Sequence, residues 1–120
     1  METKSRSNVS GKLAEDFAVH LLTQKAYCVI DRNFRSKFGE IDVIAIKDHC
    51  LIFVEVKARW SEKFGKPEEA VTPSKLWKIA RTGEYYSLLH PNLPRKLRIE
   101  VVAIEIEGGK IKSSKIIIVD

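Results

Sequence analysis

The sequence lacks the long apolar runs that mark membrane proteins. None of its hydrophobic stretches approaches the roughly 20 consecutive apolar residues that a membrane-spanning helix needs. The first residues, METKSRSNVSGK, also lack the apolar central segment of a secretory signal. We therefore expect a cytoplasmic protein that does not enter a membrane.

Cysteine, histidine and glycine-rich motifs are scarce as well. Cys28 and Cys50 form no zinc pattern and no paired framework, so we expect reduced and mostly buried thiols. His20, His49 and His90 are widely separated and match neither zinc-ligand nor catalytic-triad spacing. The sequence has no glycine-rich phosphate-binding loop, which argues against nucleotide hydrolysis.

What the chain does have is the composition of one globular domain. Its 120 residues are 44% hydrophobic and 31% charged, a balance that favours a folded core over disorder. No repeat, low-complexity tract or linker divides it, so we expect a flexible stretch at 1–7 and a single domain over 8–120. The formal net charge of +5 suits nucleic-acid binding but is also common in proteins that bind no polyanion.

Hydrophobic periodicity predicts two helices and five strands. Apolar residues recur at helical spacing over 8–24, and again over 73–89 after Thr72, which can cap a helix that begins with proline. The segment 58–71 has mixed charge and no period, and is expected to be a loop. Strand-like runs occupy 26–35, the two arms of a hairpin within 39–57, and the segments 97–107 and 110–120 around Gly108 and Gly109. The order αβββαββ predicts an α/β fold with a mixed central sheet.

The hairpin GEIDVIAIKDHCLIFVEVK, residues 39–57, carries charged side chains at the end far from its turn. A two-residue and a four-residue turn give the same register, in which Asp42 faces Glu55 and Glu40 faces Lys57. The two-residue period of a strand then puts these four side chains on one face of the sheet. The opposite face is apolar and is expected to be covered: Ile41, Val43, Ala45, Ile52, Val54 and Val56.

The opposed carboxylates of Asp42 and Glu55 need an explanation. Directly facing Cβ atoms lie about 4.5–5.5 Å apart, and like charges in that position are destabilising. One explanation is a salt-bridge network in which Lys57, Arg35 or another basic side chain neutralises the pair. The other is a divalent cation, which takes oxygen ligands and relieves the repulsion. A metal beside a lysine suits phosphodiester hydrolysis, with Lys57 orienting the attacking water or stabilising charge in the transition state.

The pattern of Asp42 followed by Glu55-Val56-Lys57 on the next strand resembles the PD-(D/E)xK superfamily of metal-dependent nucleases, which includes restriction enzymes and Holliday-junction resolvases. Further segments are similar to the YraN-like bacterial proteins, an endonuclease-like family without an assigned function. These segments are GKLAEDFAVHLL, RNFRSKFGEIDVIA, LIFVEVKAR, FGKPEEAVTPSK and RIEVVAI. The resemblance runs from residue 11 to residue 106.

The resemblance implies a restriction-endonuclease-like core with three layers, α/β/α, around the mixed sheet. It implies that Asp42, Glu55 and the backbone carbonyl of Val56 hold Mg²⁺ or Mn²⁺. Lys57 would then act as catalytic base or stabilise charge. Many members of the superfamily also use a glutamate on the first helix, and Glu15 occupies the matching position, where we expect it to reach the site.

The chain departs from the superfamily pattern in two places. The proline of the superfamily's name is absent, because Ile41 precedes Asp42, although the YraN-like branch typically has GEID there. On the fourth strand Glu100 replaces an aspartate of the family pattern, so no role is assigned to it. Glu40 is either a partner of Lys57 or an additional metal ligand, and both alternatives stay open.

Basic residues near the hairpin are candidates for contacts with nucleic-acid phosphates. Arg32 and Arg35 enter the GEID segment and are the preferred candidates. Lys75, Lys78 and Arg81 lie on the helix face away from its apolar stripe, where they either follow phosphates or form an ordinary solvated surface. No aromatic ladder for stacking single-stranded bases is evident.

Together these features predict a Mg²⁺- or Mn²⁺-dependent DNA endonuclease, resolvase-like and acting in repair or recombination. The alternative is a non-catalytic module that binds nucleic acid or joins a complex while it retains the nuclease fold. A third reading, an accessory protein whose basic face docks an acidic partner, rests on charge alone. A homodimer is expected only by analogy with resolvases, because cleavage of a junction suits two active sites.

Overall fold

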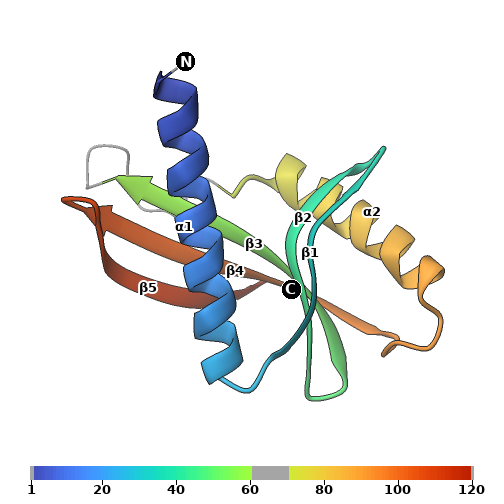
Figure 1. Cartoon of the computed structure of the whole chain (residues 1–120). Helices are drawn as coiled ribbons and strands as arrows, with labels where there is room; N and C mark the ends of the chain where they lie inside the picture. Colours follow the sequence, from blue (N-terminus) through green and yellow to red (C-terminus); the bar gives the residue numbers. More distant parts are fainter. Residues whose placement is uncertain (1, 61–70, 120) are drawn as a thin grey trace.

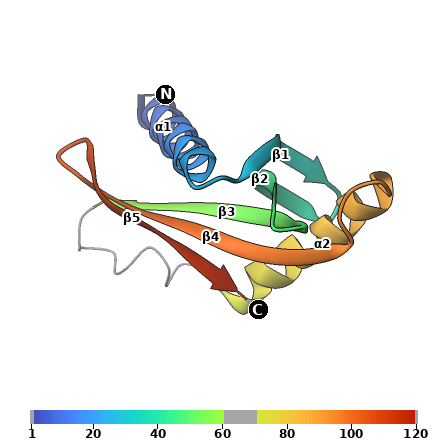
Figure 2. The same ribbon diagram turned by 90° about the horizontal axis from the view of Figure 1, so that it is seen from below.

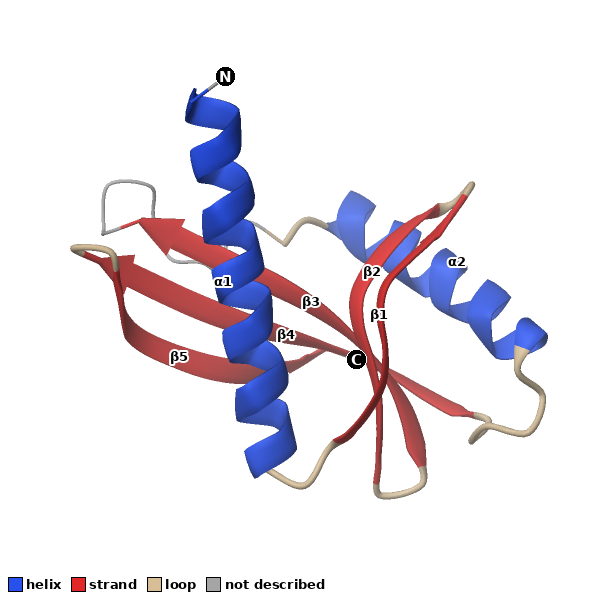
Figure 3. Cartoon of the chain, in the orientation of Figure 1, coloured by secondary structure: helices blue, strands red, loops and turns tan. Residues whose placement is uncertain are grey.

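Two helices and five strands make up the described part of the chain, residues 2–60 and 71–119 of a computed structural model, with side chains described from residue 11 onward. The order αβββαββ is the one predicted from the sequence (Figure 3). The elements are α1 (Glu2–Gln24), β1 (Cys28–Ser36), β2 (Gly39–Lys47), β3 (Cys50–Trp60), α2 (Pro73–Leu89), β4 (Lys96–Glu107) and β5 (Lys110–Val119).

The strands form one mixed sheet in the order β1-β2-β3-β4-β5. Neighbours are antiparallel except for β3 and β4, which run parallel. A parallel pair needs a crossover connection, and α2 lies within that connection. Seen from below, α1 covers one face of the sheet and α2 lies against the other (Figure 2). The expected three-layer α/β/α arrangement is therefore confirmed.

Two tight turns fix the register of the hairpins. Asp48 and His49 have φ values of 51° and 60°, and Gly108 and Gly109 have 60° and 76°. Two successive residues with positive φ are typical of the two-residue turns whose twist matches that of antiparallel strands. The turn between β2 and β3 therefore has two residues, with Lys47 paired to Cys50.

Two element boundaries differ from the sequence prediction by three residues or more. Helix α1 begins at Glu2 rather than at residue 8, since the polar segment before residue 8 contains neither glycine nor proline to stop a helix. Strand β3 continues to Trp60, because residues 58–60 stay paired with β4. Of the expected loop, residues 61–70 lie outside the described part. The flexibility of residues 1–7 stays a prediction.

Separate apolar clusters fill the two sides of the sheet. Leu22, Val43 and Val54 belong to the cluster under α1, whereas Ile44 and Phe53 belong to the cluster under α2. Adjacent strand residues thus face opposite layers, as the period of a strand requires.

Ile41 breaks the predicted alternation of β2. It was expected on the same face as Val43, but it is buried in the α2 cluster with Ile44 and Ile79. Strand β2 therefore rotates between Ile41 and Val43. This rotation lies at the same point where β2 loses its pairing with β3.

Glycine allows α2 to approach the sheet closely. A Cβ atom built at Gly83 would lie 2.5 Å from the ring of Phe53, closer than real Cβ contacts. Any larger residue at this position would have to move the helix or the ring.

Glu100 has a structural role away from the hairpin charges. It is fully buried on β4 and accepts a 2.6 Å hydrogen bond from Tyr27 Oη. Its other oxygen, Oε2, forms an ion pair with Arg98 Nε at 2.7 Å. Burial and the neighbouring Glu100 carboxylate raise the pKa of Tyr27, so the phenol keeps the proton that it donates. Glu100 therefore ties the end of the α1–β1 connection to the middle of the sheet.

Candidate active site

The candidate site lies where β2 and β3 separate. Their ladder follows the predicted register from Lys47–Cys50 to Val43–Val54 and ends there. Beyond that point β2 stays with β1, while β3 continues beside β4 (Figure 1). The facing pairs Asp42–Glu55 and Glu40–Lys57 that the register predicted thus lie beyond the end of the ladder, in a wedge between the two strands.

Asp42 bridges the two strands at the start of this wedge. Its Oδ2 accepts a 2.8 Å hydrogen bond from the backbone N–H of Val56. An unpaired N–H in a partly buried position is costly, and here a carboxylate replaces the missing partner on the neighbouring strand. The bond fixes the position of Asp42 relative to β3.

The carboxyl groups of Asp42 and Glu55 meet in the wedge. Burial, together with the charge of Glu55 and a hydrogen bond between the two side chains, raises the pKa of Asp42 to about 7. Glu55 is itself only 5% exposed. The close approach of two acids that the sequence predicted is therefore present, although it arises in the wedge and not in a regular ladder.

Two lysines lie next to this acidic pair. Lys75 Nζ is 2.9 Å from Glu55 Oε2, and Lys57 Nζ is 3.7 Å from the same atom. Burial and the neighbouring Lys75 lower the pKa of Lys57. Burial acts against the charge of Lys75 too, but its contacts with Lys57 and Glu55 outweigh it, so the pKa of Lys75 is raised. Of the two amines, Lys75 keeps its proton more firmly.

The position of Lys75 corrects a prediction. The sequence placed it on the outer face of the second helix, but its ammonium group points to Glu55. Thr72 caps α2, and its hydroxyl accepts a hydrogen bond from the backbone N–H of Lys75. One feature of the sequence could have predicted this position of Lys75, namely its spacing from Ile79. Residues four apart share a helix face, and Ile79 is in the core.

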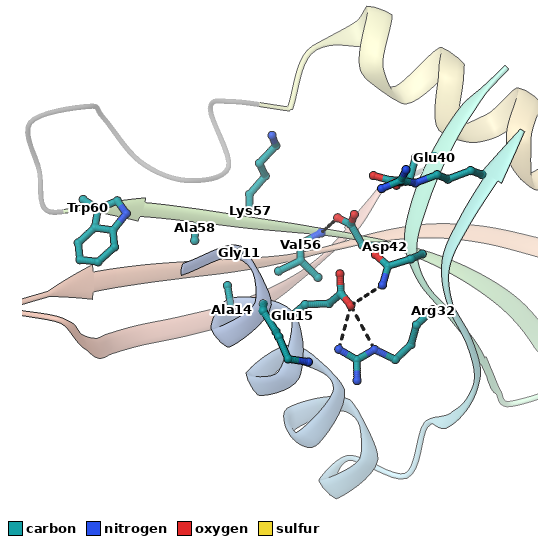
Figure 4. A pocket seen from close by; sticks show the side chains of 13 residues that line it. Gly11, Ala14, Glu15, Arg32, Glu40, Asp42, Val56, Lys57, Ala58 and Trp60 are labelled. Atoms are coloured by element: carbon teal, nitrogen blue, oxygen red, sulfur yellow. Dashed lines mark hydrogen bonds and ion pairs between the residues drawn. The ribbon is translucent and has the colours of Figure 1, made fainter. Parts of the chain in front are cut away.

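The wedge opens on both sides of the sheet. A groove of about 1020 Å³ on the side of α1 and a cleft of about 370 Å³ on the side of α2 share four lining residues: Glu40, Asp42, Val56 and Lys57. The first is called the α1-side groove and is drawn in Figure 4. The second, the α2-side cleft, also contains Glu55, Lys75 and Lys78. A ligand in either opening can reach Asp42.

Glu15 lines the α1-side groove, as expected for a glutamate on the first helix. Its Oε1 accepts hydrogen bonds from Arg32 Nη2 at 2.8 Å and from Asn33 Nδ2 at 2.9 Å (Figure 4). Arg32 also binds Asp16 at 2.6 Å. Arg32 is therefore held by two acids of α1, and it orients Glu15 towards the groove.

Arg35 and Glu40 are partners across the β1–β2 hairpin, with Arg35 Nε 2.5 Å from Glu40 Oε2. Glu40 therefore binds Arg35 and not Lys57, and its role as an additional metal ligand stays a prediction. The side chain of Arg35 is still 79% exposed, so most of its donors face solvent at the groove.

The remaining predicted phosphate contacts are separated by the structure. Lys78 lines the α2-side cleft, next to the paired acids. Arg81 forms an ion pair with Glu84 one turn along the helix and lines neither opening of the wedge. Lys75, Lys78 and Arg81 were predicted as one set, and of these Lys75 and Lys78 line the α2-side cleft.

The donor set of the wedge has two carboxylates. Among the residues that the structure describes, no group of three or more histidine, cysteine, aspartate and glutamate side chains is arranged to hold a metal ion. Mg²⁺ is commonly bound through only one or two carboxylates, with waters and substrate phosphates as its other ligands. Asp42 and Glu55, whose repulsion a cation would relieve, fit that ion.

Neither described helix, α1 or α2, is long and apolar enough to span a membrane.

Comparison with known proteins gives one consistent result. A family model described as "Uncharacterised protein family UPF0102" matches residues 14–104. A UPF0102 protein of Syntrophomonas wolfei is 39% identical over 107 residues, covering 89% of this chain and 93% of the relative. One from a Sulfurihydrogenibium species is 45% identical over 96 residues, covering 79% and 83%. One from Persephonella marina is 38% identical over 96 residues, covering 80% and 83%. The resemblance to YraN-like proteins is thereby confirmed.

Proposed function

The chain belongs to the uncharacterised protein family UPF0102, and we propose that it is a metal-dependent nuclease that hydrolyses phosphodiester bonds of DNA. The observation that carries the proposal is geometric: Asp42, Glu55 and Lys57 line one cleft, with Glu55 only 5% exposed and Lys57 Nζ 3.7 Å from its Oε2. Asp42 serves the backbone N–H of Val56, but a second buried acid beside it costs repulsion and burial, which a bound cation would relieve.

Asp42, Glu55 and the backbone carbonyl of Val56 would hold Mg²⁺ or Mn²⁺. When bound, such an ion polarises a phosphoryl oxygen and lowers the pKa of a bound water. The N–H of Val56 holds Asp42 Oδ2 in place, so one ligand is oriented before substrate arrives. Preorganised charges of this kind need little rearrangement during the reaction.

Lys57 is the proposed proton acceptor. Its pKa is lowered by burial and by Lys75, so its Nζ is closer to neutral than an ordinary lysine and can take a proton from the attacking water. The resulting ammonium group then stabilises charge at the phosphate. Lys75 keeps its proton and supports Lys57 in its neutral and its protonated state. Its charge lowers the pKa of Lys57, and its ammonium group lies against Glu55.

Substrate phosphates have cationic contacts at both openings. Arg35 lies at the α1-side groove with its side chain 79% exposed, and Lys78 lies at the α2-side cleft. Arg32 supports the groove indirectly, through Glu15. A resolvase-like reaction on branched DNA would require two copies of the chain, and we propose a homodimer for that case.

The ion pair of Lys75 favours a second candidate, a non-catalytic nucleic-acid-binding or complex-forming module. At 2.9 Å from Oε2, Lys75 Nζ neutralises Glu55 without any metal. If that pairing persists in the presence of Mg²⁺, the wedge is an internal salt bridge and the nuclease fold serves only for binding.

Cleavage assays separate the two candidates. The purified chain is incubated with linear duplex, single-stranded and branched DNA, with Mg²⁺, with Mn²⁺ and with chelator, beside Asp42→Asn and Lys57→Ala. We expect metal-dependent cleavage by the wild-type chain and none by either variant. Glu107→Gln changes an exposed acid at the end of β4 and serves as the matched control.

Cleavage that continues unchanged in both site variants points to a contaminating nuclease and removes the support for this site. Binding of DNA without metal-dependent cleavage of any substrate favours the second candidate.

A further inference from the structure

An aromatic pair lies at the tip of the β1–β2 hairpin, beside α2. Phe38, in the turn, packs edge-on against Tyr85 of α2, with their ring centroids 5.8 Å apart. The two residues are 37% and 38% exposed, so each ring also faces solvent. Phe34 lies behind Tyr85, with a centroid distance of 6.3 Å, and holds that ring from the core side. We call Phe38 and Tyr85 the aromatic platform.

The platform is aligned with the α2-side cleft. Lys78 lines the cleft, and Tyr85 follows it by two helical turns. Residues seven apart in a helix differ by only about 20° in direction and by about 10 Å along the axis, so Lys78 and Tyr85 share one stripe of α2. At the other end Lys37 Nζ lies 5.3 Å from the centroid of the Phe38 ring. One cation, Lys37, therefore lies over the Phe38 ring, and a second, Lys78, lies two helical turns from Tyr85 on the same stripe, at the candidate site.

We propose that the aromatic platform binds an unpaired stretch of nucleic acid next to the site, with bases stacked on Phe38 and Tyr85 and phosphates near Lys78 and Lys37. The proposal rests on the proposed nuclease function and names its substrate class, strands with an unpaired segment. Aromatic rings in a positively charged track are the usual means of binding single strands, because every base has a flat face. In a duplex those faces are covered by stacking, so the platform selects unpaired bases.

Positive charge at both ends of the platform argues for this ligand. A purely apolar partner would gain nothing from Lys37 and Lys78, whereas a phosphate backbone gains at each of them. The continuity of the stripe with the α2-side cleft places the stacked bases within a short distance of Asp42 and Glu55.

Binding is tested without catalysis. Fluorescein-labelled oligothymidine and a duplex of the same length are titrated in chelator, with anisotropy as the readout, for wild type, Phe38→Leu, Tyr85→Leu and the double variant. Leucine keeps apolar volume against Phe34 but removes the flat ring. Loss of one stacked base corresponds to about a 5- to 150-fold weaker Kd. We expect such a loss for oligothymidine and less than about a twofold change for duplex; Tyr85→Phe should retain the affinity.

Trp77 provides the matched control. It is an exposed aromatic residue of the same helix, 62% accessible, but it lies about 80° around the helix from Tyr85, and its ring packs with Arg81, which lines neither opening of the wedge. Trp77→Leu should leave the affinity for oligothymidine unchanged. Melting temperatures within about 2 °C of wild type show that the platform variants are folded, since a change of 1 kcal/mol moves the melting temperature of such a domain by several degrees.

The proposal is overturned if the wild-type chain binds no oligothymidine, if the double variant binds it like wild type, if duplex affinity falls equally, or if only Trp77→Leu has an effect. Oligouridine is titrated in parallel, and the same loss with it supports the platform and adds RNA as a ligand. Binding is measured in chelator, which blocks metal-dependent cleavage. If the chain binds oligothymidine through the platform but never cleaves when metal is present, only the nuclease proposal is contradicted. Cleavage with unchanged binding in the variants contradicts the platform alone.

Discussion

Asp42→Asn should stabilise the metal-free protein at alkaline pH, although it removes a residue proposed to be essential. The pKa of Asp42 is raised from 3.8 to about 7, mainly by burial and then by the charge of Glu55. An acid whose pKa is higher in the folded state than in the unfolded state contributes fully to stability at low pH, where it is protonated in both states. This contribution to the free energy of unfolding is lost as the pH rises through the folded pKa. The free energy of unfolding should therefore fall between about pH 4 and pH 7.

The size of the effect follows from the same values. At about 1.36 kcal/mol for each pH unit, a rise from 3.8 to about 7 corresponds to about 4 kcal/mol lost above pH 7. Asparagine avoids this loss, because it stays neutral and can still accept the N–H of Val56. A hydrogen bond to a neutral oxygen is weaker by about 1 kcal/mol than one to a carboxylate. We therefore expect a net gain of about 1–3 kcal/mol at pH 8.

Urea unfolding of wild type and Asp42→Asn in chelator, at pH 5 to 8.5, measures this difference. Asp16→Asn is the contrasting control: Arg32 lowers the pKa of Asp16, so this acid is ionised throughout the range, and the stability difference between this variant and wild type should be the same at every pH. Addition of Mg²⁺ or Mn²⁺ at pH 8 should stabilise the wild-type chain but not Asp42→Asn. If Asp42→Asn is no more stable than wild type at pH 8, the carboxylates do not repel each other as described.

Three further outcomes test the account. Lys57→Met should retain metal-dependent stabilisation and lose about 100-fold or more in cleavage rate, whereas equal cleavage by this variant would remove Lys57 from the chemistry. Gly83→Ala should lower the free energy of unfolding by about 1–3 kcal/mol, because the new Cβ meets Phe53, and a raised melting temperature would show that α2 moves freely. Tyr27→Phe should cost about 1–3 kcal/mol by removing the donor to buried Glu100, without change in nucleic-acid cleavage; a selective loss of cleavage would connect Glu100 to the site.

Local patterns were sufficient to predict most of the fold. Turn chemistry and the two-residue period gave the register of β2 and β3 correctly from Val43 to Lys47. The same rule failed at Ile41, because it assumes that the ladder continues. Strand β2 follows the twisted hairpin with β1, while β3 follows β4, and this choice between neighbours depends on the packing of both helices.

The candidate site was predicted in part for the same reason. Asp42 and Glu55 lie in one cleft as expected, because each directly follows the last residue pair of the predicted ladder, Val43–Val54. Lys75 was predicted only as a phosphate contact, because its backbone lies on α2 and only the packing of that helix brings its ammonium group to Glu55. The binding of Arg32 by Glu15 and Asp16 was also unpredictable from periodicity, since it depends on how α1 crosses β1.

The aromatic platform shows a second limit of periodicity. No ladder was evident in the sequence because Phe38 and Tyr85 are far apart in the chain and belong to different elements. The seven-residue spacing of Lys78 and Tyr85 was visible, but only the approach of the β1–β2 turn to α2 completes the surface.

Calorimetric titration of the purified chain with Mn²⁺ measures whether Asp42 and Glu55 bind a metal ion. The two carboxylates of the wedge should hold one ion per chain, and this binding should be absent from Asp42→Asn and from Glu55→Gln but present in Glu107→Gln and Lys57→Met. Binding of Mn²⁺ that is the same in wild type, Asp42→Asn and Glu55→Gln, or absent from the wild-type chain with and without DNA, would contradict the claim.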